Sequence, residues 1–251
     1  EFLETIYDVT AYTLEKDFHV NYDPNTGLFK GETSGLDHRS KTYPDWMDEG
    51  YFSDIMESKA SGTNIEYAVA FKVLEQASEI LGKDPAETKK WAKHFEDLKQ
   101  AINENFWVED GGYYASWQYP EYMGNVLAEK TDVIATGYAI YYDIATPEMA
   151  ERLMENYPLV KYGANTVYPQ KRGKQFGAIY HNRGVWPGWE ATLMEGAMKA
   201  GNHELAGEIM KSIMSAAARN LSNEEVINYE TGAGNNAYRQ LWSVAGHMAA
   251  F

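Results

Sequence analysis

The predicted helices are separated alternately by very short and by long connections, and this alternation limits the fold more than any other feature of the sequence. Apolar side chains recur at helical spacing, with capping residues at the ends, in the ranges 2–16, 63–81, 84–105, 132–144, 146–156, 187–200, 202–220 and 239–251. The second and third helices, the fourth and fifth, and the sixth and seventh are joined by only a few residues. The connections between these pairs are long and too rich in aromatic residues to be disordered linkers.

Such an alternation is typical of a ring of antiparallel helical hairpins, in which all tight turns lie on one rim and all long loops on the other. The sequence therefore predicts an all-α fold, an α/α toroid whose functional residues lie on the rim formed by the long loops. Small β-hairpins are expected in the long loops, at 22–29 and at Asp110-Gly111-Gly112. The alternative all-α arrangement is a helical-repeat solenoid, which requires a fixed short period, and we find no self-similar period.

The first and last predicted helices each lack the partner that a tight turn would supply. The first helix precedes a long loop, and the last helix follows one. No linker rich in Pro, Gly or Ser and no shift in composition divides the chain. We therefore expect residues 1–251 to form a single barrel domain that is truncated at both ends.

The chain is strongly acidic, with a formal net charge of −15 and a pI near 4.8. This charge argues against nucleic acid and anionic membranes as partners, because both require basic surfaces. The absence of cysteine excludes thiol catalysis and Cys-ligated zinc, and no metal cluster stands out, so we expect no cofactor. No apolar run approaches the ~20 residues of a membrane span. A small-molecule or oligosaccharide substrate fits best, while the compartment (cytoplasm or periplasm) and the oligomeric state stay open.

The densest group of aromatic and hydrogen-bonding side chains is the segment Tyr180-His181-Asn182-Arg183-Gly184-Val185-Trp186-Pro187-Gly188-Trp189-Glu190. Pro187 suits the first position of a helix, which indicates a loop that runs into a helix N-terminus. The candidates for hydrogen bonds to sugar hydroxyls are Tyr180, His181, Asn182 and Arg183, and the candidate stacking platforms are Trp186 and Trp189. The alternative is that these side chains form an aromatic plug that closes a helix end.

Carboxylates recur in the loops that we expect on one rim. They are Glu32, Asp37, Asp45 and Asp48 in the first loop, Glu190 at a helix start, and Glu224, Glu225 and Glu230 in the fourth loop. Glycosidic bond cleavage requires two carboxylates across a cleft, one to protonate the leaving oxygen and one to act as base or nucleophile. Further candidate substrate-binding residues on these loops are Arg39, Tyr43, Trp46 and Trp117. Trp91 and Trp242 fall within apolar helical stripes and are expected in the core.

In their order along the chain, these motifs resemble those of six-hairpin (α/α)6-barrel glycoside hydrolases, the group that contains glycoside hydrolase family 63 and the trehalases. The segment 31–37 is similar to the family's Glu-Ser-Gly-x-Asp segment, which implies that Asp37 is the general acid. The segment 180–187 is similar to the motif that lines the −1 subsite. The segment 225–232 resembles the one that carries the catalytic base, which implies Glu225. The resemblance covers nearly the whole chain and implies an (α/α)6-barrel catalytic domain.

The sequence departs from the family pattern around both catalytic positions. The acid segment carries one extra residue, and its Pro-Arg pair is missing, with Arg39 standing two residues after the acid. Ile227 and Tyr229 stand where the family has Tyr and Pro. These changes leave the base open among Glu225, Glu230 and Glu190.

The resemblance implies an exo-acting, inverting hydrolase of an α-linked sugar, similar to α-glucosidases or α-mannosidases. Asp37 would donate the proton and Glu225 would activate water. Two alternatives stay open. A sugar epimerase on the same toroid would use His181 together with His247 of the last helix, and a non-catalytic carbohydrate-binding module would bind sugar without turnover.

Overall fold

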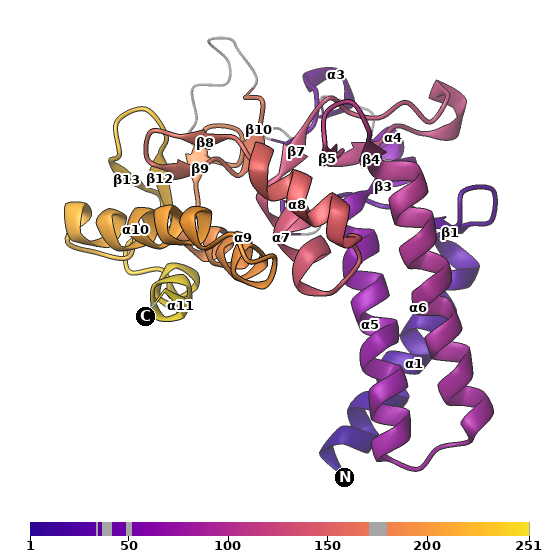
Figure 1. The fold of residues 1–251 in the computed structure, drawn as a ribbon. Coiled ribbons are helices and arrows are strands. Elements are labelled where there is room, and N and C mark those ends of the chain that lie inside the picture. The colour runs from indigo at the N-terminus through magenta and orange to yellow at the C-terminus, as the bar shows by residue number, and fades with distance from the viewer. Residues whose placement is uncertain (34, 37–41, 49–51, 171–179, 251) are drawn as a thin grey trace.

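The computed structural model describes residues 1–33, 35–36, 42–48, 52–170 and 180–250, and the architecture is mainly helical (Figure 1). The longer helices are α1 (Phe2–Val20), α5 (Ser61–Ile80), α6 (Pro85–Phe106), α7 (Val133–Tyr141), α8 (Pro147–Asn156), α9 (Pro187–Lys199), α10 (His203–Asn220) and α11 (Leu241–Ala249). Shorter helical turns are α3 (Asp45–Asp48), α4 (Phe52–Glu57) and η1 (Glu121–Met123). The longer helices lie within a few residues of the predicted ranges, whereas the sequence did not predict the short ones.

The strands are short and lie in the loops between the helices. They are β1 (Tyr22–Asp23), β2 (Leu28–Phe29), β3 (Lys59–Ala60), β4 (Trp107–Val108), β5 (Tyr113–Tyr114), β6 (Trp117–Gln118), β7 (Thr131–Asp132), β8 (Leu159–Val160), β9 (Gly163–Ala164), β10 (Val167–Tyr168), β11 (Gly184–Val185), β12 (Val226–Asn228) and β13 (Gly234–Asn235). Strands β1–β2, β4–β5, β8–β9 and β12–β13 form local antiparallel hairpins. The hairpins predicted at 22–29 and at Asp110-Gly111-Gly112 are therefore confirmed.

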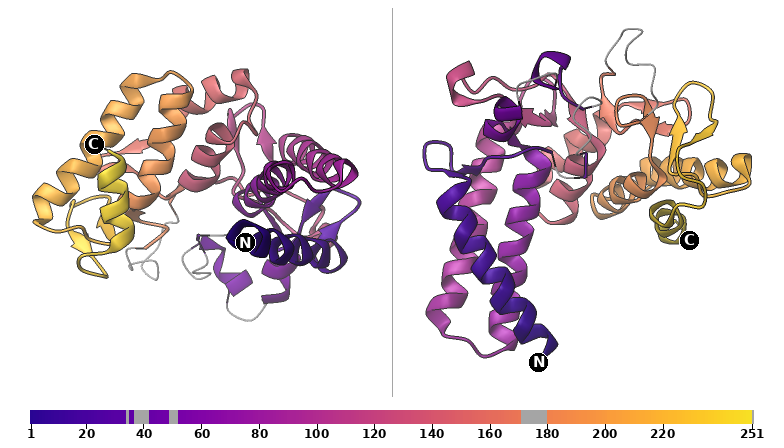
Figure 2. Two further views of the ribbon diagram at one scale, coloured as in Figure 1. Left: turned by 90° about the horizontal axis from the view of Figure 1, so that it is seen from below. Right: turned by 180° about the vertical axis from the view of Figure 1, so that it is seen from behind.

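The helices form two rows along an open arc (Figure 2). Helices α5, α7, α9 and α11 contact one another in this order and form the inner row, and α6, α8 and α10 each pack against the inner helix that precedes them. Helix α1 packs against α5, and its Tyr7 hydroxyl accepts a hydrogen bond from the Trp91 indole of α6 (3.0 Å). The predicted all-α toroid of antiparallel hairpins, with small β-hairpins in the long loops, is confirmed.

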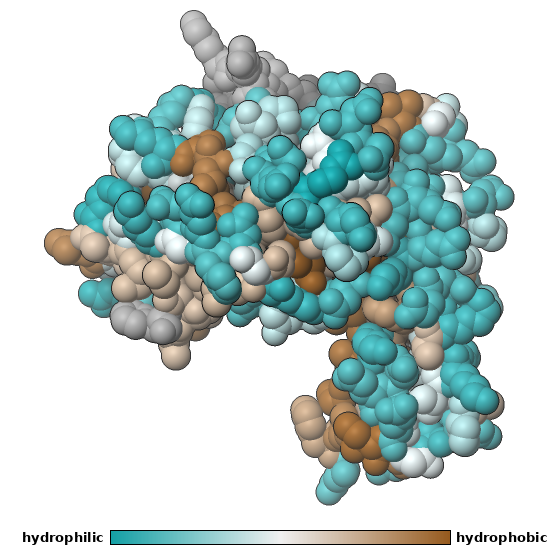
Figure 3. All heavy atoms as spheres, viewed as in Figure 1, coloured by the Kyte–Doolittle hydropathy of each residue, from teal (hydrophilic) through white to brown (hydrophobic). Residues whose placement is uncertain are grey.

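Apolar side chains are exposed on α1 and α11, which lie at the two ends of the arc. Phe2, Ile6 and Val9 are exposed on α1, and Figure 3 shows apolar surface at that end of the molecule. Leu241 and Met248 are exposed on α11. The expectation of one barrel domain that is truncated at both ends stays a prediction. In the part of the chain that the structure describes, no helix combines the length and the apolar character needed to cross a bilayer.

The tight turns between paired helices follow from stop and start signals in the sequence. Gly82 ends α5 with φ at +64°, a left-handed conformation that glycine adopts without strain. Asp84 then caps α6 by accepting a hydrogen bond from the Ala86 N–H (2.8 Å). The side chains of Thr146 and Asn202 cap α8 and α10 in the same way. Because each stop is followed almost at once by a start, the paired helices run antiparallel.

Short antiparallel strand pairs join each long loop to the next one. The strand that leads into an inner helix pairs with the strand that follows the next outer helix: β3 with β6, β7 with β10, and β11 with β12. The Ser116 N–H donates to the Lys130 carbonyl oxygen (2.7 Å), and a bridge between Asn165 and Val185 continues the series. The long loops therefore gather at one end of the inner helices, as the loop alternation predicted (Figure 1).

The main core lies between the two helix rows. Trp91 is fully buried there, as predicted. A second cluster under the first long loop contains Tyr43, Met47 and Trp117. A third, smaller cluster packs Val185 against residues of α10 and β12. The loops thus have cores of their own, which fix them to the rim.

Glycines bring the backbones of neighbouring inner helices into contact. A Cβ atom on Gly137 of α7 would lie 2.6 Å from the carbonyl carbon and oxygen of Thr192 in α9. A Cβ atom on Gly246 of α11 would lie 2.3 Å from the Pro187 carbonyl oxygen. By contrast, a Cβ atom on Gly207 of the outer helix α10 would meet no described atom within 4 Å. Main-chain contact therefore sets the spacing of the inner helices at these points.

We expect Gly137→Ala to lower the free energy of unfolding by about 1–3 kcal/mol, because the added methyl group overlaps the α9 backbone and forces the helices apart. Gly207→Ala is the matched control in an outer helix. It should be neutral or stabilising by up to about 1 kcal/mol, because alanine has the higher helix propensity. Urea unfolding followed by circular dichroism measures both effects. Equal effects of the two substitutions would contradict the backbone contact.

Candidate active site

Residues 180–190 are held at the long-loop rim by β11 and by the first turn of α9. Strand β11 pairs with β12 in the register Gly184 with Asn228 and Val185 with Ile227. Pro187 occupies the first helical position of α9, as predicted. The pairing brings this segment and the fourth long loop side by side, although they are far apart in the sequence.

The first long loop contacts the same segment. The Thr42 hydroxyl donates to the Leu36 carbonyl oxygen (3.0 Å) and lies 3.1 Å from His181 Nδ1. Because the Thr42 proton is used in the first bond, Nδ1 is the donor in the second. A Cβ atom on Gly35 would lie 3.3 Å from the Trp189 ring.

Asp37 and Arg39, the predicted general acid and one predicted sugar ligand, lie outside the described residues. Their roles stay predictions. Of the described residues on either side of them, Thr42 contacts His181, and the Leu36 carbonyl oxygen accepts a hydrogen bond from Thr42.

His181 lies in a cluster of aromatic rings. Its ring centroid is 4.4 Å from that of Tyr180 and 5.2 Å from that of Trp186. Tyr180 meets Trp186 edge-on, with centroids 5.0 Å apart. Asn182 is buried beside them, and its carbonyl oxygen accepts a hydrogen bond from the Asn165 amide (3.3 Å). The structure thus brings four of the predicted substrate-binding residues into one cluster.

Two indole N–H groups of this segment lack a hydrogen-bond partner among the described residues. They belong to Trp186 and Trp189 and are buried. Buried donors without a partner are uncommon and call for an explanation. Trp189 also stacks on Trp242 of α11, with centroids 6.1 Å apart and 26° between the rings.

The prediction that Trp242 lies in the core is wrong, because its side chain is 63% exposed. Trp242 lies in the first turn of α11, where Trp189 covers one face of its ring. The sequence contained a signal for this position. Trp189 and Trp242 both lie in the first turn of an inner helix that follows a long loop.

Glu190 points to the outer row instead of to the aromatic cluster. It is fully buried and accepts hydrogen bonds from the Ala164 N–H (2.8 Å) and the Ser212 hydroxyl (3.3 Å). A Cβ atom on Gly163 would lie 2.1 Å from its Oε1, so β9 closes over it. Burial raises the pKa of Glu190 to about 8, although the bonds from Ala164 and Ser212 lower it. At neutral pH Glu190 is therefore mostly a neutral acid enclosed between β9 and α10.

The raised pKa of Glu190 predicts a loss of stability as the pH rises from about 4.5 to about 8. In this window the unfolded chain releases the proton while the folded chain keeps it, so the unfolding free energy falls by at most about 1.4 kcal/mol per pH unit. Glu190→Gln cannot ionise, and its oxygen still accepts from the Ala164 N–H. Urea unfolding between pH 5 and pH 8 should show a shallower decline of the unfolding free energy for this variant than for the wild type.

The control Glu230→Gln removes an exposed carboxylate and should keep the wild-type slope. A wild-type slope in Glu190→Gln would refute the assignment.

The fourth long loop contributes two carboxylates in different environments. Glu225 is partly buried, and its carboxylate accepts a hydrogen bond from the Ala237 N–H (3.0 Å). Glu230 is exposed, lies 3.1 Å from the Arg183 guanidinium and accepts a hydrogen bond from the Tyr229 hydroxyl (2.8 Å). Arg183 also lies over the Tyr229 ring at 5.4 Å. Arg183 therefore connects residues 180–190, which we call the Trp186 segment, to the fourth loop.

The family described as the bacterial alpha-L-rhamnosidase six-hairpin glycosidase domain matches residues 7–160 of the chain. The chain belongs to this glycosidase family. The match covers the first two long loops and α5–α8, whereas residues 180–190 and the fourth loop lie beyond it. The expected membership among six-hairpin glycoside hydrolases is confirmed. No curated protein sequence matches the chain significantly.

Solved structures share the six-hairpin glycosidase fold at low sequence identity. An uncharacterized conserved protein from Thermus thermophilus matches 99% of this chain and 70% of its own, with a TM-score of 0.74 and 16% identity. The GH63 mannosylglycerate hydrolase from the same organism, in complex with glucose, matches 98% and 70%, with a TM-score of 0.70 and 17% identity. Neutral trehalase from Saccharomyces cerevisiae matches 97% and 56%, with a TM-score of 0.71 and 12% identity. The predicted (α/α)6-type fold, with likeness to family 63 and trehalase, is confirmed.

Two predicted substrate-binding rings of the six-hairpin glycosidase domain are core residues in this structure. Tyr43 is 0% and Trp117 1% exposed, and their centroids are 4.8 Å apart. The Tyr43 hydroxyl accepts a hydrogen bond from the Thr33 N–H (2.8 Å) and so anchors the first loop. Neither ring offers an open face to a sugar, because both are packed in the second cluster. Trp46 is 48% exposed and stacks on Tyr119, so it keeps an accessible side.

The described residues contain no group of three or more His, Asp or Glu side chains that is arranged to hold a metal ion. The family to which the chain belongs is one of glycoside hydrolases. The two alternatives, a His181 epimerase and a non-catalytic sugar-binding module, stay predictions.

Proposed function

We propose that this domain is an exo-acting glycoside hydrolase that cleaves an α-linked terminal sugar with inversion, with Asp37 as general acid and Glu225 as general base. The observation that carries the proposal is the convergence of three distant segments at one end of the inner helices. The β11–β12 pair places the Glu225 loop beside residues 180–190. Described residues that flank Asp37 contact His181 and Trp189. Residues of all three motifs named by the family resemblance thus belong to one region.

Among the carboxylates that the sequence left open, Glu225 is best suited to be the base. Glu190 is enclosed between β9 and α10. Its raised pKa means that the carboxyl group is mostly protonated at neutral pH, whereas a general base must be deprotonated. Glu230 is exposed and paired with Arg183. Glu225 is partly buried and its carboxylate is oriented by the Ala237 N–H, so it combines access with a fixed position.

An exposed aromatic face beside residues 180–190 supports a sugar ligand. The exposed Trp242 ring, which is stacked on Trp189, would cover an apolar face of a sugar ring. The glucose complex of the mannosylglycerate hydrolase, a protein of the same fold, supports this class of ligand.

Substitution of the two carboxylates should separate their roles. Asp37→Asn should lower kcat on methyl glycosides by about 10²–10⁴-fold, but much less on p-nitrophenyl glycosides, because nitrophenolate leaves without protonation. Glu225→Gln should lower kcat on both substrates, because water is no longer activated. Panels of α-glucosides, α-mannosides and α-L-rhamnosides provide the measurement, on the complete protein.

Glu230→Gln is the control for this pair, since it removes a carboxylate of the same loop and should change kcat by no more than a few-fold. If Glu230→Gln were as inactive as Glu225→Gln, the base would be Glu230. Proton NMR of the first product decides the stereochemistry. Inversion releases the β-anomer from an α-glycoside, and release of the α-anomer would rule out the inverting mechanism.

Trp242→Ala should raise KM by about tenfold with little change in kcat, because it removes a contact that is made equally in the ground state and the transition state. Tyr12→Ala, which removes another ring that is 63% exposed but lies on α1, is the matched control and should leave KM unchanged. Steady-state kinetics on the best substrate of the panel measure both variants. An unchanged KM in Trp242→Ala would exclude this ring from the substrate site.

A further inference from the structure

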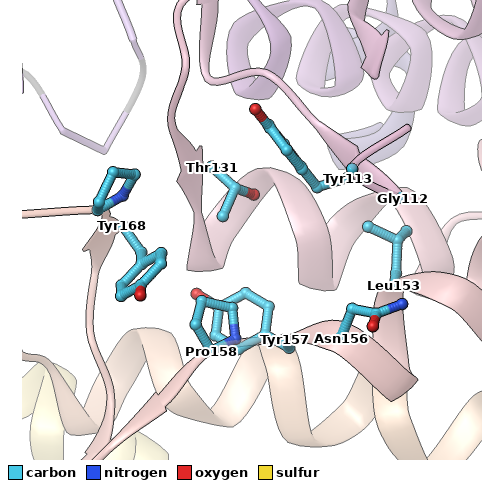
Figure 4. Close-up of a pocket in the computed structure, with 10 residues that line it drawn as sticks. Gly112, Tyr113, Thr131, Leu153, Asn156, Tyr157, Pro158 and Tyr168 are labelled. Carbon is cyan, nitrogen blue, oxygen red and sulfur yellow. The ribbon is translucent and has the colours of Figure 1, made fainter. Parts of the chain in front are cut away.

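A cavity of about 160 Å³ lies beside the outer helix α8, between the end of that helix, the β4–β5 hairpin and the β7–β10 pair (Figure 4). We call it the Tyr168 pocket and define it by Tyr113, Thr131, Asn156, Pro158 and Tyr168. None of these residues belongs to the Trp186 segment or to the loops that carry Asp37 and Glu225. The Tyr168 pocket is therefore distinct from the candidate active site.

Two successive hairpin units supply the walls of the Tyr168 pocket. Thr131 and Tyr168 are register partners across the β7–β10 pair, so their side chains are neighbours. Tyr113 approaches from β5, and Asn156 and Pro158 approach from the end of α8 (Figure 4). Tyr168 is 37% exposed, so its ring is accessible from solvent.

Among the described residues, those that line the Tyr168 pocket include no charged side chain. This is unusual in a chain with 24% charged residues and a net charge of −15. Two other cavities of the described residues are lined by charged groups, among them Lys211 and Arg219 in one and Lys99 and Asp143 in the other. Two charged groups near this lining are already engaged: Arg152 pairs with Glu109, and Lys130 donates to the Pro169 carbonyl oxygen. The Tyr168 pocket therefore suits a neutral ligand.

The chemistry and size of the Tyr168 pocket fit a single sugar ring. Tyrosine and proline rings offer faces to the C–H side of a pyranose, and hydroxyl and amide groups meet its hydroxyls. The Asn156 amide nitrogen donates to the Arg152 carbonyl oxygen (2.9 Å), which holds the side chain in place and leaves its oxygen as an acceptor. The volume is below the ~300–1,000 Å³ of drug-sized ligand pockets, which favours one ring over an oligosaccharide.

We propose that the Tyr168 pocket is an auxiliary carbohydrate site that binds one neutral sugar residue of the substrate, apart from the residue that is cleaved. The inference rests on the proposed function for the class of ligand. The pocket lies on the same long-loop rim as the candidate active site, because the bridge between Asn165 and Val185 joins the segment just before β10 to β11. A branched or polymeric substrate would thus be held at two places on one rim.

The test is a titration of the complete protein with free D-glucose, D-mannose and L-rhamnose, followed by saturation-transfer NMR and isothermal calorimetry. Free monosaccharides are not turned over, so binding is measured without hydrolysis. Tyr168→Ala should weaken one binding event by about tenfold, the change expected when a ring contact is lost. Tyr12→Ala removes an exposed ring of α1, which belongs neither to the pocket nor to the loops of the candidate active site, and is the matched control. Equal binding by wild type and Tyr168→Ala, or no binding of any of the three sugars, would overturn the proposal.

Asn156→Leu separates a sugar from an apolar ligand, because it keeps the approximate size of the side chain and removes the amide oxygen that is left as an acceptor. A sugar should bind more weakly to this variant, whereas unchanged or tighter binding would contradict a polyhydroxylated ligand. Thermal unfolding of each variant shows that the fold is retained. Tyr168→Phe keeps the ring and should bind like the wild type within about twofold, which provides a second readout if the alanine variant is unstable.

Hydrolysis of small p-nitrophenyl glycosides distinguishes a failure of this proposal from a failure of the proposed function. Tyr168→Ala should leave kcat/KM on these substrates unchanged, because the pocket lies outside the catalytic residues, and should raise KM on oligosaccharides. Glu225→Gln should show the opposite pattern, with hydrolysis of the p-nitrophenyl glycosides lost and Tyr168-dependent binding kept. If the catalytic roles are wrong, the effect of Tyr168→Ala on sugar binding is still expected. If the pocket does not bind sugar, the predictions for hydrolysis are unaffected.

Discussion

The arrangement of this domain depends on the short antiparallel strand pairs that join successive loops at one rim. Each pair links the entry of an inner helix to the exit of the outer helix that follows it: β3 with β6, β7 with β10, and β11 with β12. A pair of two- or three-residue strands adds few hydrogen bonds, but it fixes where two long loops meet. Without these pairs the helical hairpins would still form, and the loops would have no common register. The proposed chemistry depends on that register, because the register decides which loop residues lie side by side.

Two carboxylates that the sequence offered as catalytic candidates lie in different environments. Glu190 is buried toward the outer row, where the absence of water keeps its proton bound. Glu225 stays partly exposed beside the strand pair that carries residues 180–190. Both residues stand in segments with family-like motifs, and their difference comes from what packs over them. Gly163 lets β9 close on Glu190, while the fourth loop leaves Glu225 open.

The helical frame could be predicted from the sequence because its signals are local. Asp84, Thr146 and Asn202 cap the outer helices at the expected starts, and Gly82 ends α5 where predicted. The site was predicted less completely because burial is decided by tertiary packing. Tyr43 and Trp117 carry the side chains of a sugar platform, yet the second cluster encloses them. Trp242 fits an apolar stripe on its helix and is exposed, because Trp189 covers only one face of its ring. No local pattern reveals the burial of Tyr43 and Trp117, whereas for Trp242 the position in the first turn after a long loop was a better signal than the apolar stripe.

The glycine contacts between inner helices have a consequence for how such a domain acquires new substrates. Where Gly137 meets Thr192 and Gly246 meets Pro187, the helices touch through main-chain atoms. Side-chain substitutions on the inner row therefore cannot bring those helices closer together, and enlarging either glycine pushes them apart. At these two contacts the helix spacing is set by main-chain atoms and does not depend on the side chains at the rim. The long loops can therefore change in sequence while this part of the helical frame keeps its spacing.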